Sequence, residues 1–209
     1  MTLRAVVFDY GMVLTGPPDP EAHAAMLHIT GLPLDRFESL YWANRPQLDE
    51  GKLTGIAFWQ KFLHEAEINP EPGAVEELNK WDARLWTTQN LVMLAWQQQL
   101  KQRGLLTAIL SNISDNVLAS VEREFDWIRR FDVLVWSYRV HMVKPDPAIY
   151  RYTLAKLGTS PEETIFLDDR AVNVEAARAV GMKALEFLTV ERLREDLIAA
   201  GLDNVLPLP

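Results

Sequence analysis

The chain has 209 residues, of which 48% are apolar, 24% charged and 10% aromatic, and its formal net charge is −8. This length and balance are those of a globular protein with a full hydrophobic core. The acidic charge disfavours nucleic acid and anionic membrane surfaces as partners, because both require a basic face. The lack of cysteine excludes disulfides and thiolate metal sites.

The N-terminal residues and the hydropathy pattern bear on where in the cell the protein is located. The N-terminal residues lead directly into an apolar segment, without the basic and long apolar regions of a signal peptide. No run approaches 18 uninterrupted apolar residues, so we expect no membrane span. Together with the absence of cysteine, these features favour a cytoplasmic protein.

The first predicted element is a strand over residues 3–8, which are apolar except for Arg4. Such a run is typical of a strand buried on both faces of a parallel sheet. Asp9 and Gly11 follow it. Ligands bind outside the carboxyl ends of strands in open α/β sheets, so Asp9 is a candidate for chemistry. Alone, an acidic residue at this place is more often a turn or cap residue than a nucleophile.

A helical region follows a loop rich in proline and glycine. Between residues 21 and 86, apolar residues recur at helical spacing in four segments, with no strand-like alternation. Gly31 ends the first segment, Pro46 is expected to end the second, and Thr54 is a candidate N-cap for the third. We therefore predict an all-helical insertion over residues 16–87.

The insertion contains Trp42, Trp59, Trp81 and Trp86. We expect these side chains to fill the core of a small bundle, or one or two of them to line a substrate pocket. An apolar, tryptophan-rich insertion is also a candidate surface for a homodimer.

Strand and helix patterns alternate from residue 88 onwards. Strands are predicted at 105–110, 133–136, 164–167 and 183–187, separated by helices that end at Gly104 or cover 114–125, 147–157, 172–180 and 190–199. This alternation implies right-handed crossovers and a parallel sheet covered on both faces. The expected fold is α/β, with a Rossmann-like three-layer core of residues 1–15 and 88–209 and an inserted helical cap domain.

Further polar residues fall at strand ends or helix starts after Asp9. They are Ser111 with Asn112, Lys144 before Pro145, Asp168 with Asp169, and Asn173. Each has an ordinary explanation as a cap, a turn residue or a solvated lysine. Two adjacent carboxylates are nevertheless costly unless a cation or solvent compensates them. Together the residues supply a carboxylate nucleophile, a hydroxyl donor, a fixed cation and an acidic metal site.

With these motifs the sequence resembles the haloacid dehalogenase superfamily of aspartate-nucleophile hydrolases, in the subgroup with a helical cap of the C1 type after the first motif. The likeness covers nearly the whole chain. The sequence is similar to the N-terminal phosphatase domain of soluble epoxide hydrolases, and to bacterial sugar-1-phosphate phosphatases that carry glycine in the first motif. The supporting segments are MTLRA at 1–5, MVKP at 142–145 with Ile149 and Tyr150, and FLDD at 166–169. We expect no epoxide hydrolysis, because the epoxide-hydrolysing domain has no counterpart in this sequence.

The resemblance implies a Mg²⁺-dependent phosphatase of small phosphorylated metabolites. Asp9 would attack phosphorus and become a transient phosphoaspartate. The ion would be held by the Asp9 carboxylate, the Gly11 carbonyl oxygen and Asp169, with Asp168 acting through water. This set of oxygen ligands suits a hard, octahedral ion that keeps several waters.

The same resemblance assigns the remaining polar residues. Ser111 and the amide of Asn112 would hydrogen-bond the phosphoryl oxygens, and Lys144 would balance their charge. Asn173 would support the loop that carries the two aspartates. Phosphoryl transfer depends mainly on positioning and electrostatic stabilisation, which such a cluster provides.

Gly11 departs from the usual pattern of these phosphatases. Most carry a second aspartate there, two residues after the nucleophile, as the general acid/base, which typically contributes ~10²–10⁴-fold. Either a cap side chain or water replaces it, or turnover is slow, or the leaving group needs little help. The candidate substitutes are Asp19, Glu21, His23 and His141. We expect good substrates to have acidic leaving groups, as aryl, acyl or anomeric phosphates do.

Two alternatives stay open. One is a phosphate-binding relative that is catalytically weak or silent, which Gly11 supports. The other is a metal-free 2-haloacid dehalogenase, which the Asp168–Asp169 pair disfavours. The sequence does not select a substrate, and it leaves open which of Trp42, Arg45, Trp59 or Lys61 faces the site.

Overall fold

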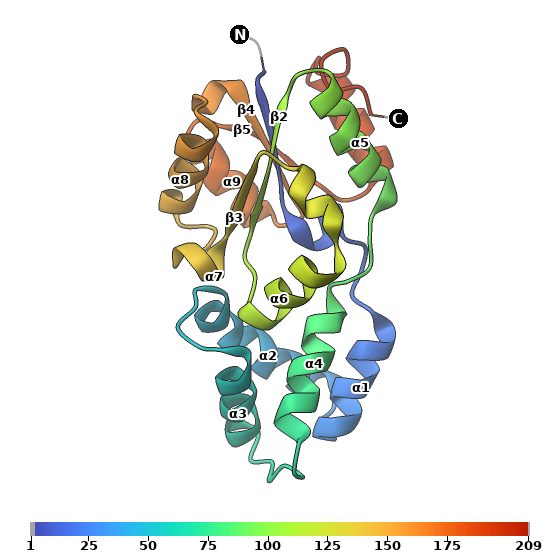
Figure 1. The fold of residues 1–209 in the computed structure, drawn as a ribbon, viewed down its shortest axis with the longest axis vertical. Coiled ribbons are helices and arrows are strands. Elements are labelled where there is room, and N and C mark those ends of the chain that lie inside the picture. The colour runs from blue at the N-terminus through green and yellow to red at the C-terminus, as the bar shows by residue number, and fades with distance from the viewer. Residues whose placement is uncertain (1–2, 209) are drawn as a thin grey trace.

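A five-stranded parallel sheet forms the centre of the larger half of the molecule (Figure 1). The structure is a computed structural model and describes residues 3–208. The strands lie in the order β3 (Val133–Trp136), β2 (Leu106–Ser111), β1 (Ala5–Phe8), β4 (Thr164–Asp168) and β5 (Lys183–Glu186). The central strand β1 is buried along its whole length, as its apolar sequence predicted.

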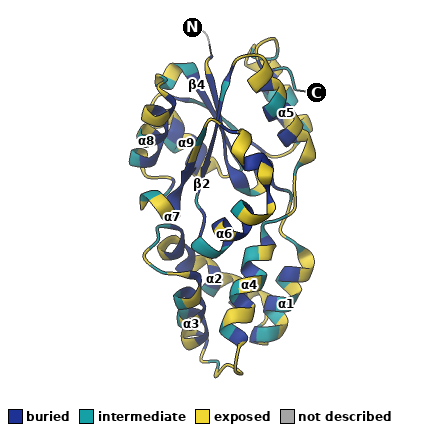
Figure 2. Ribbon diagram, in the orientation of Figure 1, coloured by how far each residue is buried: buried dark blue, intermediate teal, exposed yellow. Residues whose placement is uncertain are grey.

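Helices cover both faces of the sheet and complete the three-layer α/β core that was predicted. Alternate side chains of β1 point to opposite faces, so Val6 and Phe8 belong to one apolar cluster and Ala5 and Val7 to another. The first cluster includes α5 (Leu91–Gln102), α6 (Asp115–Glu124) and α10 (Val190–Ala199). The second includes α8 (Pro147–Leu157) and α9 (Ala171–Ala179). Figure 2 shows the buried strands between helices whose outer faces are exposed.

The predicted helical insertion is present between β1 and β2. It consists of α1 (Pro20–Thr30), α2 (Leu34–Asp49), α3 (Gly55–Glu65) and α4 (Ala74–Leu85), and it forms the lower half of Figure 1. Trp59 lies at its centre, with ring centroids of Phe37, Tyr41, Phe58 and Phe62 between 5.0 and 6.3 Å away. This cap has its own hydrophobic core, separate from the two that flank the sheet.

The chain leaves and re-enters the core at one place. Thr15 and Gln89 form an isolated antiparallel bridge, and the amide of Gly16 donates to the carbonyl of Thr88 over 3.0 Å. The division of the chain at residues 16 and 87 stays a prediction.

The expected end of the second helix near Pro46 is wrong, because α2 continues to Asp49. Proline lacks the amide that would donate to the carbonyl four residues earlier, but in the last turn this removes a single bond. The helix stops instead before Gly51, which has a φ of +77°. Arg45 and Asp49, four residues apart, thereby share one helical face.

The short helix α7 (Ser137–Val140) was not predicted. It follows β3 directly and lies next to α2 at the junction between the two halves of the molecule (Figure 1). Four residues are too few to show a helical period in the sequence. Short helical turns at Tyr10–Leu14, Asp126–Arg130 and Pro161–Glu163 were missed or merged with neighbours for the same reason. Within residues 3–208, no helix combines the length and apolarity needed to cross a bilayer.

Candidate active site

The sheet register brings the predicted site residues to one edge. Phe8 of β1 pairs with Ile109 of β2 on one side and with Leu167 of β4 on the other. The amide of Asp9 then donates to the carbonyl of Leu167 over 2.8 Å. The carboxyl ends of the three strands are therefore adjacent, which places residues 9, 111 and 168 around one point.

Lys144 occupies the centre of this group and is not a solvated surface lysine. Its Nζ lies 2.9 Å from Oδ1 of Asp9 and 2.6 Å from Oδ2 of Asp168, and its side chain is 1% exposed. Burial by itself would lower the pKa of Lys144, but the carboxylates of Asp168 and Asp9 raise it above its ordinary value. The ammonium group is therefore charged throughout the physiological range.

Asp9, Asp168 and Asp169 form an acidic cluster in which one carboxylate oxygen from each lies within 4.8 Å of the others. Burial raises the pKa of Asp9 to about 7, against the opposing charge of Lys144, and the charges of Asp168 and Asp169 act in the same direction as burial. The pKa of Asp169 is raised for the same reasons. Three carboxylates against the one charge of Lys144 leave an excess of negative charge, so the donor set fits a hard divalent cation such as Mg²⁺.

Asp168 is fixed from three directions. It accepts hydrogen bonds from Lys144, from the amide of Arg170 at 2.9 Å and from Nδ2 of Asn173 at 2.9 Å. The carbonyl of Asn173 in turn accepts from the hydroxyl of Tyr150 over 3.0 Å. Asn173 thus lies where a residue that supports the aspartate loop was expected.

Asn112 has a contact that the sequence did not suggest. Its side-chain amide donates to the carbonyl of Lys144 at 2.9 Å and its Oδ1 accepts from the amide of Lys144 at 2.8 Å. This two-point contact fixes the backbone from which the lysine extends. Ser111 lies beside it at the end of β2, buried, with its Oγ 3.4 Å from the carbonyl of Asn112. Asparagine is common in the turns that follow strands, so its position in the sequence did not indicate a contact with the backbone of Lys144.

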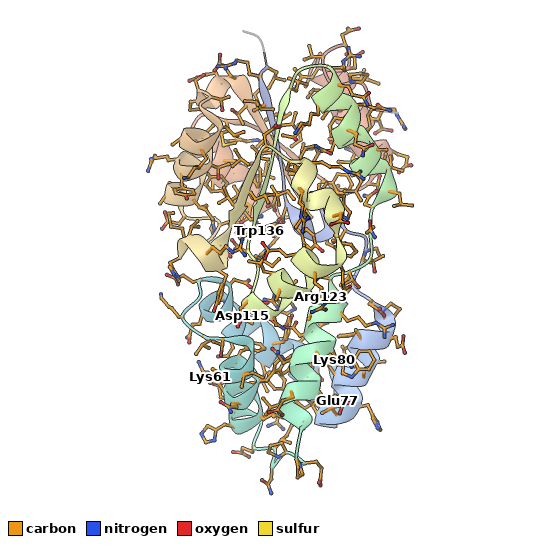
Figure 3. All side chains as sticks on the ribbon, in the orientation of Figure 1. Lys61, Glu77, Lys80, Asp115, Arg123 and Trp136 are labelled. Atoms are coloured by element: carbon orange, nitrogen blue, oxygen red, sulfur yellow. The ribbon has the colours of Figure 1, made fainter. Side chains whose placement is uncertain are left out.

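A cavity of about 350 Å³ opens between the cap and this group. It is lined by Trp42, Arg45, Pro46 and Asp49 of α2, and by Asn112, Val143, Lys144, Pro145 and Arg170 of the core. Of the cap residues left open, Trp42 and Arg45 therefore face the site. Trp59 is enclosed in the cap core, and Lys61, labelled in Figure 3, lies on α3 beside Glu65; neither lines the cavity.

The proposed substitutes for the missing acid do not line this cavity. Asp19 caps α1 and pairs with Arg84, which also binds Glu21. Nδ1 of His141 lies 3.1 Å from the carbonyl of Glu50, and Nε2 of His23 lies 3.8 Å from Glu38. The cap carboxyl that does line the cavity is Asp49, which the sequence reading did not single out.

The space beside Gly11, where most of these phosphatases carry a carboxylate, is bordered by a cap residue. A Cβ atom on Gly11 would lie 3.8 Å from Cζ3 of the Trp86 ring, an ordinary contact distance. Trp86 is the C-cap residue that follows α4, and its carbonyl accepts from the hydroxyl of Tyr10 over 2.8 Å. A side chain at position 11 is thus sterically tolerated and would contact the indole.

A parallel sheet with a helical cap after β1, and a buried Asp–Lys–Asp group at its carboxyl edge, define a haloacid dehalogenase-like hydrolase. The model of that family matches residues 4–181, so the chain belongs to it.

Relatives support the same assignment. The chain is 31% identical to mouse bifunctional epoxide hydrolase 2 over 93% of its own length, but it spans only 38% of the length of that protein. It is 30% identical to a protein of Mycobacterium tuberculosis named phosphatase MT3486, covering 88% of this chain and 87% of the relative. A haloacid dehalogenase family enzyme from Bacteroides thetaiotaomicron, solved with magnesium and inorganic phosphate, superposes with a TM-score of 0.71 at 20% identity, covering 88% of this chain and 93% of that one.

Proposed function

We propose that this hydrolase is a Mg²⁺-dependent phosphatase of small phosphorylated metabolites that works through a phosphoaspartate on Asp9. The observation that carries the proposal is the buried contact of Lys144 with both Asp9 and Asp168, beside a third carboxylate from Asp169. The names of two kinds of relative, phosphatase MT3486 and phosphoglycolate phosphatase from Xanthomonas campestris, support the reaction class. The cavity volume of about 350 Å³ fits a small substrate.

In the proposed reaction, Asp9 attacks phosphorus in line with the leaving oxygen and takes over the phosphoryl group. Lys144, charged and held by Asp9 and Asp168, offsets the negative charge of the phosphoryl oxygens. Ser111 and the amide of Asn112 hydrogen-bond the same oxygens. Water then attacks the phosphoaspartate and releases inorganic phosphate. Formation and hydrolysis of the intermediate thus use the same set of charges.

Asp9, Asp169 and the carbonyl oxygen of Gly11 would hold Mg²⁺, with Asp168 acting through water. The ion supplies positive charge that allows an anionic nucleophile to approach an anionic substrate, and it lowers the pKa of Asp9 so that the carboxylate is ionised. Asn173, which holds Asp168, positions the loop. Residues 1–15 and 88–209 form the catalytic core in this proposal, and residues 16–87 the cap that encloses the substrate.

A screen of phosphorylated metabolites with and without Mg²⁺ tests the proposal, with Asp9→Asn as the blank. We expect release of phosphate from at least one substrate, dependent on Mg²⁺ and absent in the variant. Release that persists in Asp9→Asn would overturn the assignment. Binding of a phosphate mimic without turnover of any substrate would identify a silent relative, and metal-independent release of halide from 2-haloacids would identify a dehalogenase.

A further inference from the structure

The cap side of the cavity contains a buried group with two carboxylates and one guanidinium. Arg45 lies between two carboxylates, with its Nε 2.8 Å from Oδ1 of Asp49 and its Nη1 3.2 Å from Oδ1 of Asp82. All three side chains are nearly excluded from solvent. One guanidinium cannot neutralise two carboxylates, and an uncompensated buried charge is costly, so a proton on one of them restores balance.

The hydrogen bonds decide which carboxyl takes that proton. Asp82 accepts from the Tyr41 hydroxyl at 2.6 Å, from Nδ2 of Asn116 at 3.0 Å and from Arg45, a full set for an ionised carboxylate. The side chain of Asp49 accepts from Arg45 alone among the contacts between described residues. Fewer hydrogen bonds are thus available to stabilise a charge on Asp49, and the proton belongs there.

Asp49 also has the access that a proton donor needs. Asp82 is fully buried, whereas the Asp49 side chain keeps 11% exposure and lines the cavity together with Lys144 and Asn112. Burial raises the pKa of Asp49 and the charge of Asp82 raises it further, against the opposing charges of Arg45 and Lys144, so that the pKa lies above its ordinary value. Its backbone is held by the core, because the Ser137 hydroxyl donates to the Asp49 carbonyl over 2.6 Å.

We propose that Asp49, supplied by the cap, is the general acid/base that replaces the carboxylate missing at Gly11. This inference rests on the proposed phosphatase function. As the bond from Asp9 to phosphorus forms and the bond from phosphorus to the leaving oxygen breaks, Asp49 gives its proton to that oxygen. The alcohol leaves neutral and Asp49 is left ionised.

The second half of the reaction restores the starting state. The ionised Asp49 takes a proton from the attacking water as oxygen bonds to phosphorus and the phosphoaspartate bond breaks. Phosphate leaves, Asp9 is again a free carboxylate, and Asp49 is again protonated. Because Asp49 belongs to α2, the acid is in place only when the cap is closed against Ser137 and the rest of the core.

The leaving-group dependence of kcat/KM in Asp49→Asn tests this assignment, because kcat/KM reports the steps up to formation of the phosphoaspartate. We expect kcat/KM for alkyl phosphates to fall by ~10²–10⁴-fold, and that for acetyl phosphate and aryl phosphates by less than about tenfold, since these leaving groups need little protonation. An equal loss on all substrates, or no loss on alkyl phosphates, would overturn the assignment.

Asp115→Asn is the matched control. Asp115 is also a carboxyl at the junction, where it accepts from the amide of Gly55 over 2.8 Å, but it does not line the cavity. Asparagine keeps an oxygen that accepts from the Gly55 amide, so the cap stays closed and all substrates should change by a similar factor. A selective loss on alkyl phosphates in this control would also contradict the proposal.

Gly11→Asp in the Asp49→Asn background is a second, independent arm. The backbone at position 11 tolerates a side chain, so the new carboxyl should recover hydrolysis of alkyl phosphates by at least tenfold over Asp49→Asn. No recovery would count against an acid/base role for position 49. Hydrolysis of acetyl phosphate by the wild type but not by Asp9→Asn reports the proposed function separately, so failure of either claim is recognisable.

Discussion

Lys144 is the residue on which the electrostatic balance of the site depends. It is fully buried and contacts two carboxylates, while Asp169 adds a third nearby. Removing one partner from a buried charged group leaves the others uncompensated, which is the costly change in such groups. Its surroundings therefore predict effects on both activity and stability.

We expect Lys144→Met to lower phosphatase activity by about 10²–10³-fold, the usual cost of losing one charge-stabilising group in a preorganised site. The free energy of unfolding should fall by about 3–5 kcal/mol without Mg²⁺, and by less when Mg²⁺ is added, because the ion compensates the same carboxylates. Chemical denaturation with and without Mg²⁺ measures this. Lys61→Met, at a partly exposed cap position, is the control, and equal stability of both variants would contradict the role of Lys144.

At the residue scale, helix caps follow local rules that can be recognised in the sequence. Thr54, the predicted N-cap, caps α3 through the amide of Ala57. The same kind of rule describes Asp146, which caps α8 through the amide of Ala148, and the capping box of Ser160 and Glu163. Each rule involves neighbours within four residues, so one sequence is sufficient. Asn112 and Lys144 are 32 residues apart, so local rules could not predict their contact.

Among the elements, α1 is fixed at its start by Asp19. The side chain accepts from the amides of Glu21 and Ala22, and it pairs with Arg84 of α4, which ties two cap helices together. Slight burial opposes ionisation, but these donors and the guanidinium lower the pKa of Asp19 below its ordinary value. A lowered pKa means that folding favours the ionised form, so the stabilisation is present at neutral pH and disappears in acid.

Asp19→Ala should lower the free energy of unfolding by about 1 kcal/mol at pH 7, the usual value for an N-cap. The difference from the wild type should be complete above the unfolded pKa of about 3.9 and should shrink as the pH falls through the lower folded pKa. Urea denaturation between pH 2.5 and 7 measures it. Asp35→Ala, at a first-turn position of α2 with no capping bond, controls for loss of a charge. A difference that is constant over this range would contradict the assignment.

The elements also show where periodicity fails as a guide. Most strands and long helices appeared within two or three residues of their expected bounds, because burial on one or both faces imposes a repeat on the sequence. Pro46 gave the wrong end for α2, since a proline in the last turn costs one hydrogen bond and packing of the cap outweighs it. The three extra residues include Asp49, so this small error concealed a candidate for the site.

In the whole molecule, the cap is held against the core by a few polar contacts at the junction. The amide of Gly55 donates to Asp115 at 2.8 Å, the Ser137 hydroxyl donates to the carbonyl of Asp49 at 2.6 Å, and Nδ2 of Asn116 donates to the carbonyl of Asn79 at 3.0 Å. Polar contacts of this kind are individually worth about 0.5–1.5 kcal/mol. Closure is therefore easily weakened by single substitutions.

Asp115→Ala combined with Ser137→Ala should shift the molecule toward an open cap. We expect a higher KM for every substrate and faster limited proteolysis in the segments near residues 16–19 and 86–90, where the cap joins the core. Arg129→Ala, at an exposed position on the domain that contains the sheet, is the control. Unchanged proteolysis in the double variant would show that other contacts close the cap.

The packing of the whole molecule determines which cap residues line the cavity, and the sequence did not predict them. Strand order places residues 9, 111, 144 and 168 together, and the family pattern already linked them along the chain. No such pattern links Asp49 to Asp82 or to the cavity, because their relation depends on how α2 and α4 pack and how the cap closes. The side chains that surround the leaving group were for that reason the part of the site least open to prediction.

Acid quenching during turnover of a good substrate, followed by mass spectrometry of the peptides, tests the central claim most directly. We predict a phosphoryl group on Asp9, formed only with Mg²⁺, at a rate sufficient for turnover, and missing in Asp9→Asn. A phosphoryl group on another residue, or rapid hydrolysis of substrate with no phosphorylated peptide and with full activity in Asp9→Asn, would contradict the account.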